Sequence, residues 1–183
     1  MLTVLVLSSV LLWIVVLVNV LLTVALIRRF NHSMSTFSDD TGLEKGMLAP
    51  HFTAETLSGE TVTLADYARK MVSFIFISPH CRPCVDKLPT LNTLALKAKQ
   101  AGVDLIVVST DGEKAETAAL AEKYQLHVPM LFAPQEENSF AHDYKADATP
   151  CYCMINREGQ VVSAGLFEMR WEKQLVNVWS QTS

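Results

Sequence analysis

The sequence predicts an α/β domain with a central mixed sheet flanked by helices, preceded by one transmembrane helix. Two short apolar runs, Met71–Ile77 and Val103–Ser109, have the composition of strands that are buried on both faces of a sheet. Residues 81–100 between them carry apolar side chains at helical spacing. A strand, a helix and a strand in this order predict a right-handed parallel crossover. The N-terminal segment 2–27 contains no charged side chain.

This N-terminal segment is expected to be a membrane anchor. At about 1.5 Å rise per residue, a helix over residues 2–27 would cross a hydrocarbon layer of roughly 30 Å. A cleaved signal needs a charged n-region, a shorter apolar stretch and a small-residue cleavage site, and the segment shows none of these. We therefore expect an uncleaved anchor helix over residues 1–28, a polar tether over 29–42 and the α/β domain over 43–183.

Two hairpins are predicted at either end of the domain. Residues 52–57 and 61–64 flank a turn at Gly59, which predicts an N-terminal β-hairpin extension of the sheet. Residues 151–155 and 160–166 flank a polar turn and predict the second hairpin. The remaining expected elements are helices over 113–125 and 136–144, a strand over 128–132, and a final helix that carries Trp171, Leu175 and Val178 on one stripe.

Cys81 and Cys84 form a C-x-x-C pair whose position in the chain indicates redox chemistry. The motif Cys81–Arg82–Pro83–Cys84 lies where a buried strand passes into a helix. Because unpaired N–H groups and the positive dipole end of a helix stabilise a thiolate, we expect Cys81 to be the nucleophile. Cys84 is expected to be more buried and to resolve the mixed disulfide.

A C-x-x-C pair can also be half of a zinc site, which needs two further ligands. Cys151 and Cys153 could supply them, but they form a C-x-C pattern, and the first pair lies in a redox-like context. These two residues are alternatively auxiliary thiols that relay disulfides, or small apolar side chains of a buried strand. We expect no metal and no cofactor. The alternative function is a copper- or zinc-handling module with Cys81, Cys84 and His80 as ligands.

The charged residues of the chain bear on its orientation in the membrane and on whether it binds nucleic acid. Arg28 and Arg29 follow the apolar segment, and the positive-inside rule alone would leave the domain in the cytoplasm. A disulfide-active pair at a membrane functions best facing an oxidising compartment, so we expect an extracytoplasmic domain. The formal net charge is -4 and the chain has no run of Lys or Arg, so no nucleic-acid partner is expected.

Three segments carry a resemblance to a known family. They are residues 46–52 (GMLAPHF), residues 74–84 (FIFISPHCRPC) and Thr149–Pro150. With them the chain resembles the membrane-tethered thioredoxin-like proteins of the TlpA and ResA type. It is more similar still to the MauD-like accessory proteins of methylamine dehydrogenase maturation, in its apolar N-terminal helix with Arg28–Arg29 at the end and in residues 42–46.

The resemblance implies a thioredoxin-like fold and a thiol–disulfide oxidoreductase that acts on disulfides of exported proteins, with methylamine utilisation as its most specific setting. It implies a single-pass protein of the inner (cytoplasmic) membrane with a periplasmic domain. Its partners would be protein substrates with cysteines or disulfides and a membrane redox partner. By the same resemblance Cys81 is nucleophilic, Cys84 is resolving and Pro150 is cis, and Thr149 offers its backbone to a substrate peptide.

The sequence departs from the thioredoxin pattern beside the first cysteine. His80 replaces the usual tryptophan, and a charged imidazole there would stabilise the Cys81 thiolate. The other interpretation of His80 is an exposed loop side chain. The expected active-site loop and substrate-binding residues are His80, Arg82, Pro83, Thr149 and Pro150.

The acid that thioredoxins bury six residues before the first cysteine is here Ile75. Proton transfer to Cys84 would then need another group, and Asp111 or Glu113 could approach the site. A helix N-cap and a first-turn acid explain these two carboxylates equally well. The chain lacks the Pro-x-x-x-Thr-x-x-Cys motif of the related peroxidases, which argues against peroxidase activity.

Overall fold

The structure is a computed structural model that describes residues 7, 9, 11–23, 25, 42–167 and 171–182. Met1–Asp40 and Thr41–Ser183 form two separate units. The described residues of the first unit are helical. Within the described part of the chain, no helix is both long and apolar enough to cross a membrane. Much of the predicted anchor and all of the tether except Gly42 lie outside the described residues, so both stay predictions.

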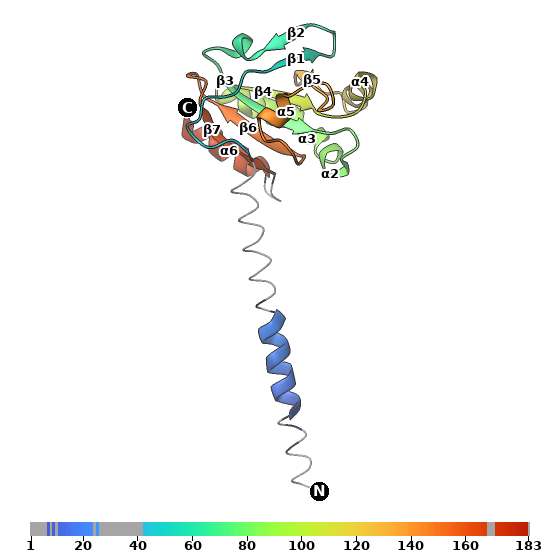
Figure 1. Cartoon of the computed structure of the whole chain (residues 1–183), viewed down its shortest axis with the longest axis vertical. Helices are drawn as coiled ribbons and strands as arrows, with labels where there is room; N and C mark the ends of the chain where they lie inside the picture. Colours follow the sequence, from blue (N-terminus) through green and yellow to red (C-terminus); the bar gives the residue numbers. More distant parts are fainter. Residues whose placement is uncertain are drawn as a thin grey trace. The chain divides into compact units, whose positions relative to one another are not determined.

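The second unit contains a seven-stranded mixed sheet in the order β2-β1-β5-β4-β3-β6-β7 (Figure 1). The central strands β3, β4 and β5 are parallel neighbours, and the other pairs are antiparallel. The mixed sheet and its N-terminal hairpin extension, β1 and β2, confirm the sequence prediction. The strands are β1 (Thr53–Thr56), β2 (Thr61–Thr63), β3 (Met71–Ile77), β4 (Val103–Ser109), β5 (Met130–Phe132), β6 (Cys151–Ile155) and β7 (Val161–Leu166).

Helices pack on both faces of this sheet. One core contains Leu88 and Leu91 of α3, Leu175 of the C-terminal helix, and alternate residues of β3 and β4. The other core contains the N-terminal segment of the domain and the short helix α5. The helices are η1 (Leu64–Tyr67, 3-10), α2 (Arg82–Val85), α3 (Leu88–Gln100), α4 (Lys114–Lys123), α5 (Phe140–Asp143) and α6 (Trp171–Thr182).

Two helix predictions need correction. The helix expected over 81–100 is interrupted between α2 and α3, because Pro89 has no N–H to donate to the Val85 carbonyl and its ring crowds that oxygen. The helix expected over 136–144 forms only as α5. There Asn138 Oδ1 accepts the Phe140 N–H at 2.9 Å, a local bond that replaces the helical one.

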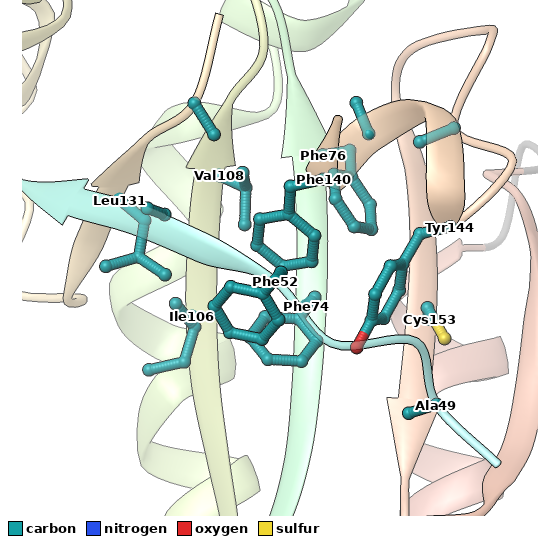
Figure 2. Packing of buried hydrophobic residues seen from close by; sticks show 14 of the residues in the cluster. Ala49, Phe52, Phe74, Phe76, Ile106, Val108, Leu131, Phe140, Tyr144 and Cys153 are labelled. Carbon is teal, nitrogen blue, oxygen red and sulfur yellow. The ribbon is translucent and has the colours of Figure 1, made fainter. Parts of the chain in front are cut away.

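Aromatic rings fill the core on the α5 face (Figure 2). Phe52 and Phe140 stack with ring centroids 3.8 Å apart, and Phe74 of β3 meets both of them edge-on. The Tyr144 hydroxyl donates to the Pro50 carbonyl oxygen at 2.9 Å. This cluster joins the N-terminal segment and α5 to β3, the strand that leads into Cys81.

Replacing Phe74 tests how much this cluster stabilises the domain. Phe74→Ala should lower the free energy of unfolding by about 3–5 kcal/mol, because a fully buried ring is lost and a cavity is left. Urea titration of the full chain, followed by tryptophan fluorescence, measures it. Leu96→Ala is the control, since Leu96 is 66% exposed and its loss should change stability by only about 0.5 kcal/mol. A similarly small effect of Phe74→Ala would contradict the role of the cluster.

Candidate active site

The site is built where the parallel strands β3 and β4 end side by side. Ile77 pairs with Ser109 at the carboxyl ends of the two strands. The backbone N–H of Thr110 donates to the Ile77 carbonyl oxygen at 2.9 Å, and its hydroxyl donates to the same oxygen at 3.1 Å. Thr110, directly after β4, therefore holds the end of β3 at the point where the chain turns toward Cys81.

Cys81 is the accessible thiol of the pair. It caps the N-terminus of α2 with an extended backbone, and it is partly exposed. Its Sγ donates to the Thr149 carbonyl oxygen at 3.4 Å, so the loop before β6 lies against the nucleophile. The Thr149–Pro150 peptide bond is cis, as the resemblance implies.

Cys84 is a buried thiol, only 1% exposed. Burial raises the pKa of Cys84 to about 12, and its hydrogen bond with the Cys81 side chain raises the pKa in the same direction. A pKa this far above neutrality means that Cys84 carries its proton at physiological pH. Because only a thiolate attacks a disulfide, a protonated Cys84 is consistent with the predicted order, in which Cys81 attacks first and Cys84 resolves; the order itself stays a prediction.

Cys151 and Cys153 point into the aromatic core, on the face of β6 opposite Tyr152 (Figure 2 shows Cys153 beside Tyr144). Burial raises the pKa of Cys151 to about 12 and that of Cys153 well above its usual range. Negative charge on Cys84, once that thiol loses its proton, would raise the pKa of Cys151 further. Their burial fits small apolar side chains of a strand, and a disulfide relay stays a prediction.

The other predicted loop residues surround the pair. The side chain of His80 is 59% exposed, and its Nε2 lies 3.5 Å from Glu116 Oε2. Arg82 and Pro83 are exposed on α2, and Thr149 and Pro150 are half-buried beside Cys81. Their roles in substrate binding stay predictions. Among the described residues, no group of three or more His, Cys, Asp or Glu side chains is placed to hold a metal ion.

The two acids considered for proton transfer have different surroundings. Glu113 is the N-cap of α4 and takes part in a capping box, which fits its structural interpretation. Asp111 Oδ2 accepts a hydrogen bond from Ser78 Oγ at 3.2 Å, in the turn that precedes Cys81. Ile75, at the position of the missing acid, is packed in the same core as Cys84.

A cleft of about 670 Å³ opens beside Cys81. Its walls come from the ends of β3 and β4, the segment after β5 and the loop before β6. Sequence reasoning missed Ser78 and Thr110 in this wall. Their positions in the sequence indicate them, because each directly follows one of two parallel strands, and polar residues in such positions meet at one edge of a sheet. Four carboxylates line the cleft: Asp111, Glu113, Glu136 and Asp147.

This arrangement supports dithiol–disulfide exchange in two steps. The Cys81 thiolate attacks one sulfur of a substrate disulfide, forming a mixed disulfide and releasing the first substrate thiolate. Cys84 then gives up its proton and attacks Cys81 Sγ, which releases the second substrate thiolate. Two electrons pass to the substrate and the enzyme is left with a Cys81–Cys84 disulfide. The oxidised pair runs the same steps in reverse.

A partly exposed thiol followed one turn later by a buried thiol is the arrangement that a thiol–disulfide oxidoreductase needs, and with the relatives described below it identifies the chain as a member of this class. Thiol–disulfide exchange implies cysteine-containing protein substrates. Residues 46–164 match the AhpC/TSA family, and the chain belongs to that family.

Relatives agree with this class. The chain is 27% identical over 137 residues to a thiol-disulfide oxidoreductase ResA of Bacillus cereus, covering 75% of this chain and 78% of that protein. It is 29% identical over 124 residues to thioredoxin-like protein YneN of Bacillus subtilis, covering 67% of this chain and 71% of that protein. The chain is therefore a distant relative of ResA-like thiol-disulfide oxidoreductases.

Solved structures show the same fold. A putative protein disulfide isomerase from Bacteroides thetaiotaomicron superposes with a TM-score of 0.67 at 26% identity, over 78% of this chain and 92% of that one. A putative thiol:disulfide interchange protein DsbE from Chlorobium tepidum has a TM-score of 0.67 at 22% identity, over 76% of this chain and 98% of that one. These structures confirm the expected thioredoxin-like fold.

Selective alkylation tests the asymmetry of the thiols. Between about pH 7 and pH 9, iodoacetamide should modify Cys81 of the reduced full chain well before the buried cysteines, because the thiolate is the reactive form. The pKa of about 12 keeps Cys84 protonated in this range, and its labelling should rise only in strongly alkaline solution. Mass spectrometry of the peptides measures the order. Equal labelling of Cys84 and Cys81 would contradict it, and Cys81→Ser should leave the chain largely unlabelled.

Proposed function

We propose that this oxidoreductase is held at the cytoplasmic membrane by its N-terminal segment and exchanges disulfides of exported proteins outside the cytoplasm. Its most specific form would be the maturation of methylamine dehydrogenase or of a similarly disulfide-rich client, as in the MauD-like proteins that the sequence resembles. The observation that carries the proposal is an accessible Cys81, backed by the buried thiol of Cys84, at the mouth of an open cleft.

The shape and lining of the cleft favour a polypeptide substrate. Pockets for small molecules are mostly enclosed and apolar. This cleft is instead open and has carboxylates and backbone groups on its walls, including the Thr149 carbonyl oxygen that already binds Cys81 Sγ. An extended client segment with its own backbone donors and acceptors fits such a surface.

The composition of the N-terminus supports the membrane location. Residues 2–27 carry no charge, and the described residues 11–23 within them are helical. Disulfide exchange with structural disulfides belongs in an oxidising compartment, which lies outside the cytoplasm. A helix over residues 2–27 would keep the cysteine pair at the membrane surface, within reach of exported clients and of a membrane redox partner.

A copper- or zinc-handling function would need Cys81, Cys84 and His80 to converge on one ion. The His80 ring is turned to Glu116 instead, with 3.5 Å between Nε2 and Oε2. Cys84 also lies in the apolar core with a strongly raised pKa, which disfavours the thiolate that a metal requires. Disulfide exchange therefore explains the site better than metal transfer.

A reporter fusion tests the proposed location. An enzyme that is active only outside the cytoplasm is fused to the C-terminus of the full chain and its activity is measured in intact bacterial cells. The proposal predicts an active, membrane-bound fusion. The matched control lacks residues 1–28 and should be inactive and released from the membrane fraction. An inactive full-length fusion would place the domain in the cytoplasm and contradict the proposal.

A further inference from the structure

The nucleophile is carried by a short turn that follows β3. The backbone N–H of Cys81 donates to the Ser78 carbonyl oxygen at 3.1 Å, which closes the turn. The Ser78 side chain reinforces it, because Ser78 Oγ accepts the His80 N–H at 3.2 Å. Ser78 is buried and bonded on both sides, so its hydroxyl sets the conformation of the residues just before Cys81.

Residues 111–116, which follow β4, contact the turn. Their contacts are with the first three residues of the turn, Ser78, Pro79 and His80. Asp111 Oδ2 accepts the Ser78 hydroxyl at 3.2 Å. Gly112, at φ +77°, approaches Pro79 so closely that a Cβ there would lie 2.9 Å from the proline Cγ. The third contact is between His80 and Glu116, the first-turn acid of α4.

The Asp111 carboxylate is itself held in place. Its Oδ1 accepts the Gly112 N–H at 2.7 Å, while Oδ2 faces Ser78. The preceding residue, Thr110, is tied to the end of β3 through the Ile77 carbonyl oxygen. The backbone that carries the Asp111 carboxylate is therefore anchored to the end of β3, the strand that Ser78 directly follows.

We propose that Asp111 is a positioning residue for disulfide exchange, which acts through the Ser78 hydroxyl to fix the turn that carries Cys81. The proposal rests on the exchange function of the Cys81–Cys84 pair. Asp111 bonds to neither sulfur in the described contacts. Its effect is to order the turn so that Cys81 Sγ is held within reach of Cys84.

The positioning role of Asp111 predicts the direction in which loss of the Ser78–Asp111 hydrogen bond shifts the equilibrium between the Cys81–Cys84 dithiol and its disulfide. Closing the Cys81–Cys84 disulfide requires the two sulfurs to meet, and an ordered turn raises their effective concentration. Loss of the Ser78–Asp111 hydrogen bond should therefore favour the dithiol and make the reduction potential less negative. Loss of the Asp111 charge acts in the same direction, because a nearby anion disfavours the Cys81 thiolate. The two contributions must be separated by the choice of variants.

The experiment is a glutathione redox titration of the full chain in detergent solution, with the oxidised fraction read by mass after alkylation. Ser78→Ala should lower the equilibrium constant for the disulfide about fivefold, the value of one ordinary hydrogen bond, and Asp111→Ala should lower it further because it also removes the carboxylate charge. For this two-electron couple a fivefold change makes the potential about 20 mV less negative. Because the two residues share one hydrogen bond, the double variant should shift no further than Asp111→Ala alone.

Two matched variants separate position from charge. Asp111→Asn keeps an oxygen that accepts the Ser78 hydroxyl and should shift the equilibrium less than Asp111→Ala. Glu136→Gln removes a carboxylate from the same cleft without touching the turn, so it measures the effect of charge alone and should shift the equilibrium less than Asp111→Ala. Urea titration of each variant checks that it is folded.

The outcomes are distinct. Additive shifts in the double variant would show that the two residues act independently and would overturn the positioning role. Equal shifts for Asp111→Asn, Asp111→Ala and Glu136→Gln would overturn it in favour of charge alone. Wild-type potentials in folded Ser78→Ala and Asp111→Ala would overturn it outright. If the wild-type chain forms no Cys81–Cys84 disulfide with glutathione at all, the exchange function itself fails.

Discussion

The parallel pairing of β3 with β4 is the constraint on which the site depends. Its register runs from Met71 opposite Val103 to Ile77 opposite Ser109, so both strands end at one edge of the sheet. The turn with Cys81 leaves the first strand there, and the segment with Asp111 leaves the second. All seven residues of β3 are buried between two cores, which fixes this register from both faces. A slip of one residue would move the nucleophile and its supports apart.

The chemistry of the pair follows from a difference in burial over a single turn. Cys81 reaches solvent and the cleft, whereas Cys84 lies in the apolar core with Ile75 and Leu88. Burial there keeps the second thiol protonated, which fits the resolving role predicted for it. Cys151 has a similarly raised pKa, but it is not among the residues that line the cleft beside Cys81.

Much of this could be predicted from the sequence, and the failures have physical causes. The buried runs of β3 and β4 and both hairpins follow from local periodicity and turn residues. The break before α3 was visible in Pro89, but the apolar spacing on either side of the proline suggested one continuous helix. The bond between Ser78 and Asp111 joins residues far apart in sequence, so it needs the strand register rather than any local pattern. The exchange site was predicted from Cys81 and Cys84, and Asp111 and Thr149 were expected near it, but Ser78 and Thr110 were not.

Trapping of the mixed disulfide tests most directly whether Cys81 attacks and Cys84 resolves. The full chain with Cys84→Ser is mixed with an oxidised protein that contains disulfides, and covalent complexes are identified by non-reducing electrophoresis and mass spectrometry. We expect a stable complex linked through Cys81, because the resolving thiol is gone. The Cys81→Ser chain should form none. A complex linked through Cys84, or complexes of equal yield from both variants, would contradict the assigned order of attack.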